Sequence, residues 1–166
     1  MSQYMIVVVN RASARFFTLE PVTFPELESG PRITILTELE NQELKNNQAL
    51  FSDSKTGRGA APRGGAVHGY DDKREQHLDE LRRRFAVKVL DRIQKAAKAE
   101  HSRDIILAAS VRMRRFLFSE IEALGQKGYR IHKISKNMIN LSPEKIHEHL
   151  AERGVVPAKS RQLTTA

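Results

Sequence analysis

The sequence of 166 residues contains no cysteine. The chain therefore has no disulfide framework, no thiolate nucleophile and no thiolate metal ligand. It also lacks a run of about eighteen apolar residues, so no segment is expected to span a membrane. The apolar run from Met5 to Val9 has no basic segment before it and no small-residue cleavage site after it. This run predicts a buried strand rather than a signal peptide, and a cytoplasmic location is expected.

Familiar catalytic and metal-binding motifs are lacking as well. There is no P-loop, and the glycine-rich stretch "GRGAAPRGG" follows a polar segment without dinucleotide-binding spacing. There is no nucleophile elbow. His147 and His149 are two positions apart and would point away from each other on a helix, while only His68 has a ligand-type residue, Asp72, four positions on. We therefore predict no metal and no cofactor, and the catalytic residues, if any, are unknown.

What the sequence does have is positive charge. It contains 28 lysine and arginine residues against 20 aspartate and glutamate residues, which gives a net charge of +8. Such a balance favours an anionic partner: nucleic acid, the ribosome, an acidic protein or an anionic membrane surface. Good solubility is the alternative explanation.

The order of predicted elements is typical of an α/β fold. Apolar or alternating stretches predict strands at residues 4–10, 15–19, 33–39, 105–109 and 129–135. Spacings of three and four predict helices after Asp71 or Asp72, over residues 111–124 and from Pro143 to Leu150. A short first turn implies an antiparallel hairpin, and the late strand-helix-strand units imply parallel pairing. We therefore expect a mixed five-stranded sheet with about three helices in a single domain, residues 1–153, followed by a loose tail, residues 154–166.

Two patterns predict which side chains are buried. In the third strand Ile33, Ile35, Thr37 and Leu39 alternate, so they are expected to share one half-buried face. The long helix carries an apolar stripe at spacings of three and four: Leu78, Leu81, Phe85, Val89 and Ile93. We expect Leu81, Phe85 and Leu107 to lie in the core.

The same helix carries a basic stripe, Arg84, Lys88, Arg92 and Lys95, beside the apolar one. The segment from Lys73 to Arg103 contains ten basic and five acidic residues. Glu80 with Arg84, and Asp91 with Lys95, are spaced to form i,i+4 ion pairs. The stripe is either a solvated face or a surface that binds nucleic acid.

A segment without periodicity, residues 42–70, precedes this helix and predicts a flexible loop. Its basic residues are Lys55, Arg58 and Arg63, and no acidic residue lies between Lys55 and Gly69. Glycines such as Gly64 and Gly65 let a backbone approach a partner closely, and arginines bind phosphate. The loop is either a phosphate-binding element or a solvated tether.

Several stretches, in this order, resemble the bacterial host attachment protein family: "LFSDSKTGRG", "DDKREQHLDELRRRFAVKVLDRI", "DIILAAS" and "KISKNMINLSPEKIHEHL". The resemblance covers about residues 4–151. That family is similar in turn to the middle domain of class 1 release factors and of Pelota. In release factors a Gly-Gly-Gln loop before the long helix promotes peptidyl-tRNA hydrolysis. Here Gly64 and Gly65 stand in the matching place, and Ala66 replaces the glutamine and lacks its amide.

Three functions remain open. The first is a binding protein that contacts the ribosome, tRNA or structured RNA, and it ranks highest. Its candidate residues are Lys55, Arg58, Arg63, Gly64, Gly65, Arg84, Lys88 and Arg92. The second is a peptidyl-tRNA hydrolase-like enzyme, and the third is a protein required for attachment to host cells through protein or surface contacts. The sequence does not specify an oligomeric state.

Overall fold

The computed structural model describes residues 4–47 and 65–160, with side chains from residue 72 onward in the second range. One sheet contains β1 (Tyr4–Val9), β2 (Ser13–Glu20), β3 (Arg32–Glu40), β4 (Asp104–Ala109) and β5 (Arg130–Ser135). The strand order is β3-β2-β1-β4-β5. β1 pairs with β2 in antiparallel fashion and with β4 in parallel fashion. The predicted mixed five-stranded sheet is therefore confirmed.

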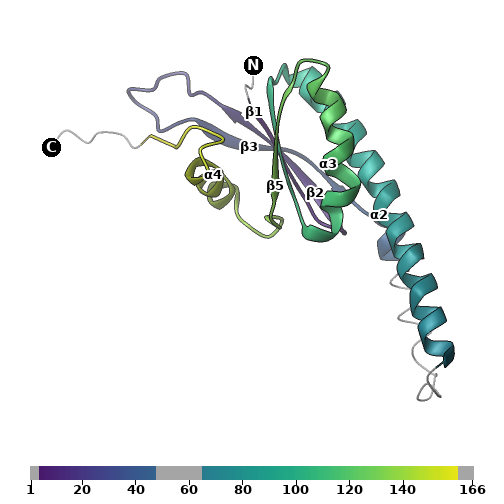
Figure 1. Cartoon of the computed structure of the whole chain (residues 1–166). Helices are drawn as coiled ribbons and strands as arrows, with labels where there is room; N and C mark the ends of the chain where they lie inside the picture. Colours follow the sequence, from purple (N-terminus) through teal and green to yellow (C-terminus); the bar gives the residue numbers. More distant parts are fainter. Residues whose placement is uncertain (1–3, 48–64, 161–166) are drawn as a thin grey trace.

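Helices cover both faces of the sheet. α2 (Gly65–Glu100) and α3 (Val111–Gly125) lie on one face, and α4 (Pro143–Glu152) lies on the other (Figure 1). Residues 42–47 form a further short helix. None of these helices, over the residues described, is long and apolar enough to cross a membrane.

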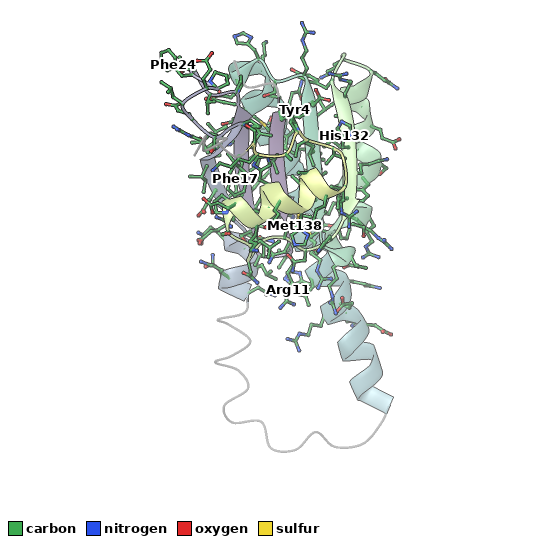
Figure 2. All side chains as sticks on the ribbon, turned by 90° about the vertical axis from the view of Figure 1, so that its left-hand side faces the viewer. Tyr4, Arg11, Phe17, Phe24, His132 and Met138 are labelled. Carbon is green, nitrogen blue, oxygen red and sulfur yellow. The ribbon has the colours of Figure 1, made fainter. Side chains whose placement is uncertain are left out.

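The core consists of two apolar layers separated by the sheet. On one face Met5 and Val7 of β1 pack with Phe85 of α2. On the other face Ile6 and Val8 belong to a cluster that includes Ile146 and Leu150 of α4. Met138, which is labelled next to α4 in Figure 2, belongs to the same cluster. The three residues expected in the core are buried, with exposed fractions of 4% for Leu81, 2% for Phe85 and 0% for Leu107. That prediction is confirmed.

The expected single buried face of β3 is wrong, because the strand contains a β-bulge. Ile35 pairs with Phe17 and Thr37 pairs with Phe16, which leaves Leu36 as an extra residue between them. The extra residue moves the second half of the strand to the opposite face. Ile33 accordingly packs with the α4-side cluster, while Leu39 packs with the α2-side cluster. Ile35 and Leu36 are left 46% and 38% exposed.

The predicted start of the long helix is also wrong. α2 begins at Gly65 rather than after Asp71 or Asp72. Its first turns extend past the edge of the sheet (Figure 1). A helical segment that leaves the sheet needs no apolar stripe, so periodicity does not reveal it.

The other end of the predicted flexible loop is helical too. Asn41 is the N-cap of the helix at residues 42–47, because its Oδ1 accepts a hydrogen bond of 3.3 Å from the backbone N–H of Leu44. Leu44 is 2% exposed and anchors the short helix to the fold. The remainder of the predicted loop, residues 48–64, lies outside the described residues.

The end of the chain differs from the loose tail that the sequence predicts from residue 154. Val156 is 6% exposed and belongs to the α4-side cluster. The carbonyl oxygen of Pro157 lies 2.8 Å from Nε2 of His147. The backbone N–H of Ser160 donates a hydrogen bond of 2.8 Å to the carbonyl oxygen of Gly30. Val155 and Val156 are therefore packed on the fold and Ser160 is hydrogen-bonded to it, while residues 161–166 lie outside the described residues.

Replacing Phe85 by alanine should lower the free energy of unfolding by about 3–5 kcal/mol, because the ring is buried between α2 and the sheet. The matched control is Val87→Ala on the same helix, where the side chain is 62% exposed and the expected change is about 0.5 kcal/mol or less. Urea denaturation of the three proteins measures both effects. Equal effects of the two substitutions would contradict the orientation of α2.

Candidate nucleic-acid interface

The basic stripe of α2 lies in solvent beside the edge strand of the sheet. Lys88, Arg92 and Lys95 are exposed and form one wall of an open groove of about 650 Å³. The other wall is formed by Leu36, Thr37 and Leu39 of β3. Asp91 and Ala96 complete the α2 wall, so the groove has mainly basic residues on one side and partly apolar strand residues on the other.

Acidic neighbours neutralise only part of this stripe. Arg84 is paired with Glu43 at 3.4 Å and with Glu80 at 3.5 Å. Lys95 is paired with Asp91 at 3.0 Å. Both i,i+4 ion pairs predicted from the sequence are therefore confirmed.

Lys88 and Arg92 differ from their neighbours on the stripe. Neither has an acidic partner in the described part of the chain. Two exposed cations without a partner, on the wall of a groove, leave their charge available to an anionic ligand.

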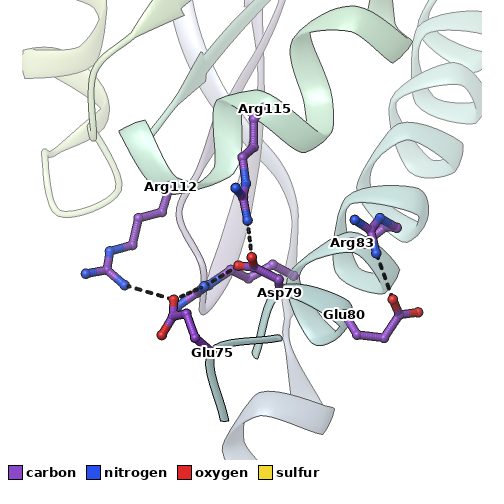
Figure 3. A network of polar contacts seen from close by, with 7 residues as sticks. Glu75, Asp79, Glu80, Arg83, Arg112 and Arg115 are labelled. Carbon is purple, nitrogen blue, oxygen red and sulfur yellow. Dashed lines mark hydrogen bonds and ion pairs between the residues drawn. The ribbon is translucent and has the colours of Figure 1, made fainter. Parts of the chain in front are cut away.

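A second basic group, which the sequence analysis missed, lies at the start of α3. Arg112, Arg114 and Arg115 fall within its first five residues. Cations at a helix N-terminus oppose the helix dipole, and this unfavourable placement is the signal by which the sequence could have revealed them. Arg112 is 3.9 Å from Glu75, and Arg115 is paired with Asp79, so these two arginines join α3 to the segment of α2 around residues 75–79 (Figure 3).

The centre of this network is the buried Arg82. Its side chain is 3% exposed and donates hydrogen bonds of 2.9 Å to Glu75 and 2.6 Å to Asp79. Its Nε has no hydrogen-bond partner. Arg82 lies four positions after Leu78 and three before Phe85, so the apolar stripe itself predicts that this arginine faces inward. The sequence analysis did not use that spacing.

The electrostatics of the network keep both partners charged. Burial alone would raise the pKa of Asp79, but hydrogen bonds from Arg82 and Arg115 outweigh it and hold that pKa below its ordinary value. Burial likewise disfavours the charged form of Arg82, and its hydrogen bonds to Glu75 and Asp79 raise its pKa overall. The network therefore joins the middle of α2, from Glu75 to Arg82, to the first turns of α3.

Of the other predicted site residues, the structure describes only Gly65. Lys55, Arg58, Arg63 and Gly64 lie outside the described residues. Gly65 is the first residue of α2, and Ala66 is also helical rather than part of a loop. At 1.5 Å per residue, the start of α2 is about 35 Å from Lys88 along the helix. In the described part of the chain no three histidine, aspartate or glutamate side chains are grouped so as to hold a metal ion.

The fold and this surface define an α/β protein with a mixed sheet and an exposed basic stripe on its longest helix. The chain belongs to the family described as "Protein required for attachment to host cells", which matches residues 5–150.

Among solved structures, the chain is similar to an archaeal translation termination factor, with 14% sequence identity and a TM-score of 0.37. The match covers 91% of this chain and 39% of that factor. A likeness this remote assigns neither a common fold nor a common function. No curated protein matches the sequence.

Replacing Asp79 by asparagine should lower the free energy of unfolding by about 1–3 kcal/mol at neutral pH, because Arg82 loses a charged hydrogen-bond partner. The pKa of Asp79 is lowered in the folded state, so its stabilisation is complete above the unfolded pKa of about 3.9. It is lost as the pH falls through the folded pKa. The difference between wild type and variant should therefore shrink below about pH 4.

Urea denaturation at neutral pH and at about pH 3 measures this difference. Asp91→Asn is the matched control, since its surface pair with Lys95 should contribute about 0.5 kcal/mol or less. An Asp79→Asn difference that is the same at both pH values would show that the carboxylate charge is not what stabilises the network.

Proposed function

We propose that the protein binds structured RNA, on the ribosome or free, through the basic stripe of α2. The observation that carries this proposal is the position of Lys88 and Arg92, which are exposed on the wall of the groove beside β3 and have no acidic partner within the residues that the structure describes. Lysine and arginine side chains that neutralise phosphates release counterions, which is the main source of sequence-independent affinity for nucleic acids.

The shape of the surface supports the same proposal. Arg84, Lys88 and Arg92 recur every four residues, so they follow one another at about 6 Å along the helix axis. A row of cations along a groove is the arrangement with which proteins follow a nucleic-acid backbone. The exposed Leu36 on the opposite wall offers apolar contact to a sugar or base.

The test is the salt dependence of RNA binding. Each phosphate contact contributes about 0.7 to the slope of log affinity against log salt for a single strand, so changing Arg84, Lys88 and Arg92 together to glutamine should flatten the slope by roughly two units. The measurement is a titration of ribosomes or a structured RNA at several salt concentrations. The matched control is Lys145→Gln with Arg153→Gln, which removes charge on the α4 side of the sheet.

Two results would contradict the proposal. One is a triple variant that keeps the full slope, and the other is a wild type that binds structured RNA no more tightly than a scrambled polyanion.

We further propose that Arg58 and Arg63 contribute to the same interface. Changing these two to glutamine should flatten the slope by a smaller amount.

Attachment to host cells is the second candidate function, and the family match over residues 5–150 favours it. A deletion strain complemented with wild type or with the triple variant separates the two candidates. If attachment depends on RNA binding by the stripe, wild type should restore adhesion and the triple variant should not. Full adhesion with a triple variant that no longer binds RNA would show that attachment uses a different surface.

A further inference from the structure

A second basic site lies at the C-terminal end of α2, apart from the groove beside β3. It is a cavity of about 570 Å³ lined by Ala97, Lys98, His101, Ser102, Arg103 and Tyr129. No acidic residue lines it. The side chains of Lys98, Arg103 and Tyr129 have no hydrogen-bond or ion-pair partner within the described residues.

The backbone at this end of α2 is arranged in an unusual way. α2 ends at Glu100, and His101 then adopts a left-handed conformation with φ of 55°. The backbone N–H of Ser102 donates a hydrogen bond of 3.0 Å to the carbonyl oxygen of Ala97. This is the helix ending in which glycine is the common residue, because a side chain is strained there. A histidine in that position, with its side chain on the cavity wall, points to a use for the imidazole.

Ser102 supplies an independent observation. The residue is 4% exposed, and its Oγ is buried without a hydrogen-bond partner among the described residues. Buried hydroxyl groups nearly always have a partner, so one that lacks a partner calls for an explanation. Ser102 is also one of the residues that line the cavity.

The acids closest in sequence, Glu100 and Asp104, do not line the cavity. Asp104 is buried and already paired with Arg130 at 3.0 Å and with His132 at 3.3 Å. The cavity is therefore surrounded by an ammonium group, a guanidinium group, two hydroxyl groups and an imidazole, with no carboxylate.

We propose that this cavity binds a phosphate group. Lys98 and Arg103 supply the charge, Arg103 offers the planar donor pair that suits phosphate oxygens, and Tyr129 and Ser102 donate hydroxyl hydrogen bonds. The phosphate belongs either to a small phosphorylated molecule or to the end of an RNA strand. The site is separate from the proposed RNA-binding stripe and does not depend on it.

The test uses the full chain titrated with inorganic phosphate at constant ionic strength, followed by thermal shift and by the amide NMR signals of His101, Ser102 and Tyr129. Phosphate should raise the melting temperature and move those signals. Changing Lys98 and Arg103 to glutamine should weaken binding at least tenfold. Arg153→Gln, an exposed arginine on the α4 side, is the matched control and should bind as wild type does.

Ser102→Ala tests the role of the hydroxyl. Because the hydroxyl has no partner in the fold, the variant should be at least as stable as wild type without phosphate, and it should bind phosphate several-fold more weakly. A loss of stability without phosphate, together with unchanged binding, would show that the hydroxyl has only a structural role. The proposal would be contradicted if the Lys98/Arg103 variant bound phosphate as tightly as wild type does. It would also be contradicted if chloride raised the melting temperature as much as phosphate does.

Two further titrations identify the source of the phosphate. A short oligonucleotide with a 5′-phosphate that binds more tightly than the same strand without it assigns the site to an RNA end. Equal binding of the two strands, with inorganic phosphate still bound, assigns it to a small phosphorylated molecule. The Arg84/Lys88/Arg92 variant should keep its phosphate binding, so failure of the stripe proposal and failure of this one are distinguishable.

Discussion

The pairing of β1 with β4 is the constraint on which the remaining structure depends. The register joins Met5 to Ile105 and Val9 to Ala109, and both strands are buried on both faces from Met5 to Val9 and from Asp104 to Ala109. A strand pair that is apolar on both faces needs a covering layer on each side. α2 and α3 form one layer, and α4 with Val155 and Val156 forms the other.

α2 is longer than the sheet that it covers, and this mismatch creates the distinctive part of the molecule. The second half of the helix is held by apolar contacts through Phe85, Val89 and Ile93. Beyond these apolar contacts, toward the N-terminus of the helix, the ion-pair network of Arg82 joins α2 to α3. Removing one partner from a buried ion pair is costly, because the other charge stays buried. The network therefore sets the direction in which the first turns of α2 leave the body.

The sequence predicted most accurately the elements whose buried residues form a continuous run or recur at a regular spacing. β1 and β4 were recognisable as continuous apolar runs, and the buried face of α2 was recognisable from its regular spacing. The bulge at Leu36 was not, because an alternating pattern looks the same whether or not one residue is left unpaired. The start of α2 at Gly65 was missed for a different reason. A helical segment outside the core has no apolar stripe, so its sequence shows no helical periodicity.

For the candidate site, the sequence indicated which residues carry charge but not which charges are free. Arg84 and Lys95 belong to the predicted stripe, yet each has an acidic partner. Their pairs could be anticipated at i,i+4 spacing, whereas the pairing of Arg84 with Glu43 joins residues far apart in the chain. The phosphate-binding cavity was invisible in the sequence because Tyr129 reaches it from the segment before β5, beside the end of α2.

The distinction between total and free charge explains why a net charge of +8 is a poor guide to where a polyanion would bind. A paired cation must break its ion pair before it can contact a phosphate, so its pairing energy is subtracted from its contribution to binding. The arginines at the start of α3 are numerous, but two of them are engaged with α2. Lys88, Arg92, Lys98 and Arg103 are unpaired in the described part of the chain. These four lie on the second half of α2 or just after it, where the helix is packed on the sheet. Other exposed cations in the described part of the chain that are in no ion pair, such as Arg11, Arg32, Lys127 and Arg153, are scattered over other elements.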